Sequence, residues 1–185
     1  ADTLMVSVDC RGIGGVRGVL GSIASGLVAE IAQIAEIDPA IRALASFLST
    51  VTHVDTASIK NLNQHIVQHK LAFKGQGSLK TLKMLNSEFA ISLERTETEI
   101  KTLQADTTVT FDIDRLLNLT LTVFEDIRNT NYRVFLLVDN LDELQHEYGT
   151  EEELKATAKT INRILRLCEA PIGMLFCMRS YFFHG

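Results

Sequence analysis

Three carboxylates follow a short apolar run in the second half of the chain. The run is Val134–Val138, and Asp139, Asp142 and Glu143 come after it. An apolar run of this length, β-branched at both ends, predicts a strand buried on both faces of a sheet. Parallel α/β sheets bind ligands at the carboxyl ends of their strands. Carboxylates at that edge can hold a hydrated Mg²⁺ and orient a water molecule.

The pattern of an apolar run, Asp, any residue, an apolar residue, Asp and Glu resembles the Walker B motif of P-loop NTPases. It is most similar to the NACHT branch of the STAND ATPases, and the match covers about ten residues directly. The resemblance implies ATP and Mg²⁺ as cofactors. It also implies that Asp139 binds Mg²⁺ through water, and that Glu143 or Asp142 positions the attacking water. The alternative is a buried strand followed by a solvated acidic turn.

A second apolar run, from residue 172 to 178, predicts a strand that ends at Arg179. In STAND and AAA-type ATPases, the strand after Walker B ends with a polar or basic sensor near the γ-phosphate. The resemblance therefore implies that Arg179 contacts the nucleotide, where an Arg can pair phosphate oxygens bidentately. The alternative is an Arg at a strand end that pairs with a nearby carboxylate.

No segment of the chain carries a complete Walker A loop. Residues 74–81 approach the form G-x-x-x-x-G-K-[ST], but Lys74 and Leu79 replace the two glycines that such a loop needs. A corner between helices with Ser78 as N-cap is favoured, so Lys80 is not expected to bind phosphate. Gly12, Gly14 and Gly15 also lack the following Lys-Ser/Thr. The resemblance then places the phosphate loop upstream of Ala1 and implies a gap between the strands of this piece.

The order of apolar patterns predicts an α/β fold, with three strands recognised in a parallel sheet with right-handed crossovers. We interpret residues 1–185 as a single partial P-loop NTPase domain, with a mostly helical insertion over residues 13–104. The strand Leu4–Val8 is expected to pair in parallel with Val134–Val138. Both ends look cut, so the chain is expected to be a piece of a larger protein.

The amino-acid composition limits the classes of partner that the protein could bind. The chain has 185 residues, 46% hydrophobic and 22% charged, with a net charge of −5 and no Trp. This composition is globular and gives no evident sign of nucleic-acid binding. No run reaches about 18 apolar residues, and the helix expected over 16–34 lacks a Lys/Arg-rich face, so no membrane contact is evident. The isolated Cys10, Cys168 and Cys177 predict buried thiols in a reducing, cytoplasmic setting.

Two functions follow from these patterns. The first is part of an ATP-binding and ATP-hydrolysing signalling switch, of the kind that STAND proteins provide in defence, death or transcriptional signalling. Its partners would be further copies of itself or other protein domains of the parent chain, and the piece alone is expected to be inactive. The alternative is a non-enzymatic helical protein-interaction module or a degenerate NTPase.

Overall fold

In the part of the chain that the structure describes, the main sheet is parallel and has three strands. A computed structural model describes residues 2–53, 56–58, 108–129, 132–144, 151–170 and 172–177. The strands β1 (Asp2–Asp9), β4 (Tyr132–Asp139) and β5 (Gly173–Phe176) form this sheet in the order β1-β4-β5. β1 and β4 are parallel along their whole length, from Asp2 opposite Tyr132 to Asp9 opposite Asp139. This register confirms the predicted pairing of residues 4–8 with 134–138.

The expected gap in the sheet is wrong. β4 is hydrogen-bonded to β1 on one side and to β5 on the other, so the three strands are immediate neighbours. β5 is also shorter than the run from 172 to 178 predicted. Arg179 and the segment 74–81, which includes Lys80, lie outside the described residues.

Among the described residues, four α-helices accompany the sheet: α1 (Gly15–Ala32), α2 (Pro39–Thr52), α5 (Ile113–Arg128) and α6 (Glu151–Leu165). Short 3₁₀ turns, η1 (Leu141–Glu143) and η2 (Arg166–Glu169), follow β4 and α6. The starts of two of these helices have a clear cause in the sequence. α2 begins at Pro39, and the Asp112 side chain caps α5 by accepting a hydrogen bond of 2.7 Å from the backbone N–H of Arg115.

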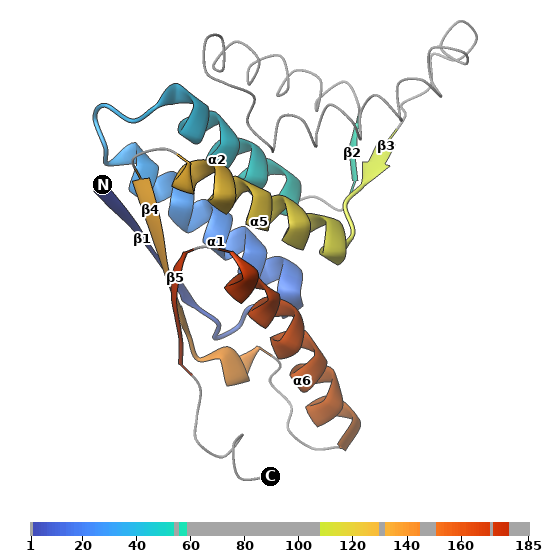
Figure 1. The fold of residues 1–185 in the computed structure, drawn as a ribbon. Coiled ribbons are helices and arrows are strands. Elements are labelled where there is room, and N and C mark those ends of the chain that lie inside the picture. The colour runs from blue at the N-terminus through green and yellow to red at the C-terminus, as the bar shows by residue number, and fades with distance from the viewer. Residues whose placement is uncertain are drawn as a thin grey trace, which may run out of the picture.

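The core lies between one face of the sheet and the helices α1, α2 and α5, which Figure 1 shows stacked on the same side of the strands. Every second residue of β1 and β4 points into this core. These six residues are at most 4% exposed: Leu4, Val6, Val8, Val134, Leu136 and Val138. α1 and α5 lie next to the sheet, because α1 contacts β1 and α5 contacts β4, whereas α2 packs on these two helices.

The opposite face of the sheet is open. Met5 of β1 is 59% exposed and Leu175 of β5 is 51% exposed, while Phe135 and Leu137 between them are partly buried. The prediction that 134–138 is buried on both faces is therefore wrong. The reason is that the core-forming helices lie on one side, so only alternate residues of the run are covered.

A second, two-stranded sheet pairs β2 (Thr56–Ser58) with β3 (Thr108–Thr110) in antiparallel fashion. Their β-branched Thr residues suit strands, but three residues are too few to show a period. Within residues 13–104, the described elements are the helices α1 and α2 and the strand β2.

α1 is the described helix that could cross a membrane by length and composition. It has 18 residues, whereas the sequence alone had indicated no apolar stretch of this length. Close to half of it, 44%, is buried within the protein, where it contacts β1 and α2. Core packing therefore accounts for its apolar composition.

Two glycines of α1 should respond in opposite ways to the same substitution. A Cβ on Gly21 would lie 3.4 Å from the ring of His53, an ordinary contact, whereas a Cβ on Gly26 would lie only 2.8 Å from Cγ1 of the buried Val6. Gly21→Ala should raise the free energy of unfolding by about 0.5–1 kcal/mol through helix propensity. Gly26→Ala should lower it by about 1–3 kcal/mol through overpacking. Urea denaturation measures both, and a stabilised Gly26→Ala would contradict the close approach of α1 to β1.

Candidate functional site

The carboxyl ends of β1 and β4 bring two carboxylates to one edge of the sheet. Asp9 ends β1, Asp139 ends β4, and the two residues are partners in the parallel register. The backbone continues this pairing for one step, because the N–H of Cys10 donates to the carbonyl of Asp139 over 2.9 Å. Asp139 therefore lies at the edge where its sequence position predicted it, and Asp9 is an additional acidic neighbour.

Asp9 is held by Arg11 and Asn140. Arg11 Nε donates to both carboxylate oxygens of Asp9, at 3.0 and 2.8 Å, and its Nη2 forms an ion pair with the same group. The Asn140 Nδ2 donates to Asp9 Oδ1 over 3.0 Å. The side-chain hydrogen bond from Arg11 is the largest cause that lowers the pKa of Asp9 well below its usual value, followed by the Arg11 backbone and Asn140. The same hydrogen bond raises the pKa of Arg11.

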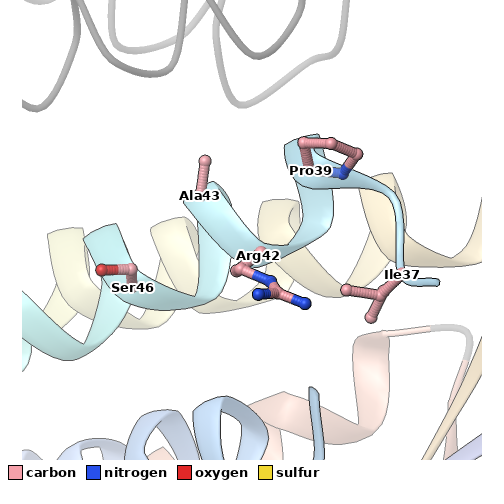
Figure 2. Close-up of a pocket in the computed structure, with 5 residues that line it drawn as sticks. All are labelled: Ile37, Pro39, Arg42, Ala43 and Ser46. Atoms are coloured by element: carbon pink, nitrogen blue, oxygen red, sulfur yellow. The ribbon is translucent and has the colours of Figure 1, made fainter. Parts of the chain in front are cut away.

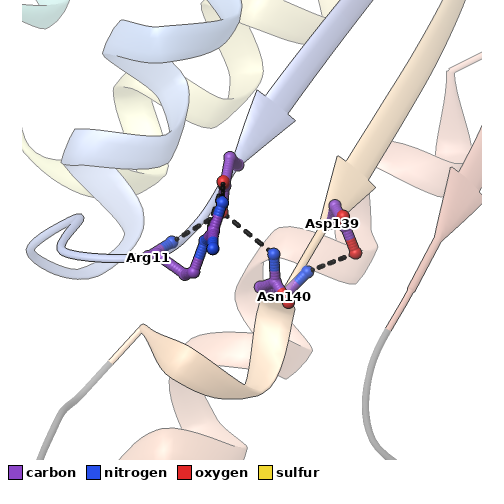
Figure 3. Close-up of polar contacts among 4 residues, drawn as sticks. Arg11, Asp139 and Asn140 are labelled. Carbon is purple, nitrogen blue, oxygen red and sulfur yellow. Dashed lines mark hydrogen bonds and ion pairs between the residues drawn. The ribbon is translucent and has the colours of Figure 1, made fainter.

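Asn140 joins the ends of the two strands. Its backbone N–H donates to Asp139 Oδ1 over 2.8 Å, while its side chain reaches Asp9 on the neighbouring strand (Figure 3). Its backbone is left-handed, with φ 52° and ψ 41°, and it is the one non-glycine residue with positive φ in the described part of the chain. Asn tolerates this conformation better than most residues. The chain therefore turns sharply immediately after Asp139.

The turn η1 separates the two remaining acidic candidates. Leu141 is buried, and its N–H donates to the carbonyl of Cys177 beyond the end of β5. Asp142 is also buried, with 0% of its surface exposed, and it has polar or electrostatic partners. Glu143 is only partly buried. Of these two carboxylates, Glu143 is the one that solvent can reach.

Cys10 follows Asp9 in the chain and is fully buried. Its burial, followed by the negative charges of Asp9, Asp139 and Asp142, raises its thiol pKa to about 12. This thiol stays protonated and unreactive at neutral pH. The expected burial of Cys168 is wrong, because α6 changes into the 3₁₀ turn η2, which exposes Cys168 and buries Leu167 instead.

The residues at this edge could bind Mg²⁺ only through one or two protein ligands. Within the described ranges, no group of three or more His, Cys, Asp or Glu residues could enclose a metal. Asp9 is engaged by Arg11, whereas Asp139 is exposed and uses Oδ1 for a single hydrogen bond from its neighbour. Mg²⁺ in nucleotide sites takes one or two carboxylates and completes its shell with phosphate and water. Asp139 suits that role, with Glu143 close by in sequence.

A separate hollow of about 490 Å³ lies along the first turns of α2 (Figure 2). It is lined by Ile37, Pro39, Arg42, Ala43 and Ser46. The Tyr132 hydroxyl, at the amino end of β4, donates to the carbonyl of Glu36 over 3.4 Å. The hollow is thus near the amino end of the sheet and is not part of the edge that carries Asp9 and Asp139.

Comparison of the chain with protein-family models, with curated proteins and with solved structures found no match. The fold itself defines a class, an α/β protein with a three-stranded parallel sheet. The polar cluster at its carboxyl edge is formed by Asp9, Arg11, Asp139 and Asn140. Of these four residues the sequence had indicated only Asp139.

We expect Asp9 to remain ionised when the pH falls through 3.8, the ordinary value for an Asp side chain. Because its pKa is lowered in the folded state, Asp9 stabilises the fold above pH 3.8, and that contribution is lost as the pH falls through the lowered native value. Arg11→Ala should move the pKa of Asp9 back towards 3.8, whereas Arg42→Ala on α2 should not. Carboxyl carbon NMR titration measures the effect, and an unchanged Asp9 pKa in Arg11→Ala would contradict the assigned cause.

Proposed function

We propose that this chain is part of an ATP-binding and ATP-hydrolysing switch module similar to the STAND ATPases. One observation carries the proposal: an exposed carboxylate, Asp139, ends the central strand of a parallel sheet and is followed by a tight turn that carries Glu143. This edge is where parallel α/β sheets bind their ligands.

The proposed roles follow from exposure and position. Asp139 would bind Mg²⁺ through water, and the ion would neutralise negative charge on the phosphates. Glu143 is partly exposed and would orient the attacking water, whereas the buried Asp142 would hold the turn against the core. Arg179 would pair phosphate oxygens, as the resemblance implies.

The proposed partners are further copies of the same protein or other domains of a longer parent chain, in the cytoplasm. In a nucleotide switch, contacts with phosphate and Mg²⁺ hold one arrangement of the surrounding segments, and hydrolysis releases it. Asp139 and Glu143 belong to one strand and one turn. A change at the nucleotide would therefore alter the packing of the core through Leu141, which is buried and belongs to the same turn.

The decisive test is ATP binding to the full-length parent protein, measured by calorimetry with and without Mg²⁺. Asp139→Ala should weaken binding of the Mg²⁺–ATP complex by about tenfold or more, equivalent to about 1.4 kcal/mol. Binding of ATP without Mg²⁺ should change little, because Asp139 acts through the ion. Asp2→Ala is the matched control, since it removes an exposed Asp from the opposite end of β1. A wild-type protein that binds ATP equally with and without Mg²⁺, or not at all, would refute the proposal.

A second candidate function is protein interaction without catalysis. The open face of the sheet favours it, because Met5 and Leu175 expose large apolar side chains there. This function predicts that nucleotide binding is absent from the full-length protein. It also predicts a parent sequence without a strand that ends in G-x-x-x-x-G-K-[ST].

A further inference from the structure

We propose that Asn140 is a positioning residue, which bridges Asp9 and Asp139 and thereby fixes the direction in which the Asp139 carboxylate points. The inference rests on the proposed function, because the purpose of that direction is to meet Mg²⁺. It goes beyond the family resemblance, in which the residue after the first Asp is unspecified.

The bridge uses two donors of a single residue. Asn140 Nδ2 donates to Asp9 Oδ1 at 3.0 Å, and the backbone N–H of Asn140 donates to Asp139 Oδ1 at 2.8 Å. The two acceptors belong to residues that are partners in the β1–β4 register. The position of one carboxylate is therefore tied to that of the other through one amide side chain and its own backbone (Figure 3).

The ion pair between Asp9 and Arg11 sets the net charge at this edge. Two carboxylates on neighbouring strands repel each other, but Asp9 is neutralised by its ion pair with Arg11. The side chains of Asp9, Arg11 and Asp139 together leave one negative charge, which belongs to Asp139. Asp9 Oδ1 accepts hydrogen bonds from both Arg11 Nε and Asn140 Nδ2. Without this arrangement the guanidinium of Arg11 would be available to compete with Mg²⁺ for Asp139.

The left-handed backbone of Asn140 supports a second, separable role. It turns the chain so that the Leu141 N–H meets the carbonyl of Cys177, at 3.1 Å, and the Glu143 N–H meets the carbonyl of Asn140, at 2.9 Å. Glycine adopts this backbone conformation freely but has no side chain. Asn140→Gly therefore keeps the turn and removes only the side-chain half of the bridge.

The experiment titrates Mg²⁺ into the full-length protein at fixed ATP and measures binding, not turnover. Asn140→Gly should raise the Mg²⁺ concentration for half-maximal ATP binding by about fivefold, the worth of one lost hydrogen bond. Its affinity for ATP without Mg²⁺ should be unchanged. Asn129→Gly, the same substitution at the end of α5, should leave both values unchanged. Asp9→Ala removes the acceptor instead of the donor and should also raise the Mg²⁺ requirement.

Amide hydrogen exchange without nucleotide reports on the turn itself. We expect the N–H groups of Leu141 and Glu143 to stay protected in Asn140→Gly. A wild-type Mg²⁺ requirement in both Asn140→Gly and Asp9→Ala would overturn the inference and leave the proposed function standing. If Asn140→Gly loses amide protection, the decision passes to Asp9→Ala made in an Arg11→Ala background and compared with Arg11→Ala alone, because Arg11 can then no longer compete for Asp139. A wild-type protein without Mg²⁺-dependent ATP binding would overturn the proposed function first, and the inference with it.

Discussion

Leu136→Ala should lower the free energy of unfolding by about 2–5 kcal/mol, which is a large part of the stability of a domain of this size. Leu136 is 0% exposed and lies on the central strand. Its register partners are Val6 on β1 and Met174 on β5, and both belong to or pack against the same core. The truncated side chain leaves a cavity that the strands cannot close without breaking their pairing.

Leu175→Ala is the matched control for this prediction. It is the same substitution on the adjacent strand, but Leu175 is 51% exposed on the open face, so the cost should be less than about 1 kcal/mol. Urea denaturation followed by circular dichroism measures both variants. Equal losses would mean that the open face is covered in solution as completely as the helical face, and the one-sided core would then be wrong.

The contrast between Leu136 and Leu175 shows what the sequence could predict about the fold. Strand positions and parallel pairing were predictable, because short apolar runs separated by long helical segments have few other arrangements. One-sided burial was not, because 134–138 is apolar at every position and its pattern does not distinguish one covered face from two. The change from α6 to the 3₁₀ turn η2 exposes Cys168, and the 3.6-residue apolar period of the sequence does not predict where such a change occurs.

The edge of the sheet that carries Asp9 and Asp139 was predicted in part. The place of Asp139 follows from an apolar run that ends in a charged turn. Asp9 was missed, although it holds the same position after Val8 as Asp139 holds after Val138, and this equivalence was a usable signal. The bridge through Asn140 was beyond the sequence, since it needs the strand register and a left-handed backbone together.

The structure also separates Asp142 from Glu143, which the sequence left nearly equivalent. Asp142 is completely buried and lies close enough to Cys10 for its charge to raise the pKa of that thiol. A general base must reach the water that it activates, directly or through one further water. The partly exposed Glu143 meets this condition, whereas the buried Asp142 is better placed to hold η1 against the core.

Under the proposed function, Glu143→Gln in the full-length protein should therefore keep nucleotide affinity and reduce kcat for ATP hydrolysis by about 10²–10⁴-fold, because the amide keeps the shape of the side chain without its basicity. Asp142→Asn should act mainly on stability and lower the melting temperature, with a smaller effect on kcat, since it alters a buried polar group and its partners. Phosphate release under saturating Mg²⁺–ATP, together with thermal denaturation, measures both variants. The reverse pattern, with a large loss of kcat in Asp142→Asn and an unaffected rate in Glu143→Gln, would move the water-orienting role to Asp142 and require η1 to turn outward when nucleotide binds.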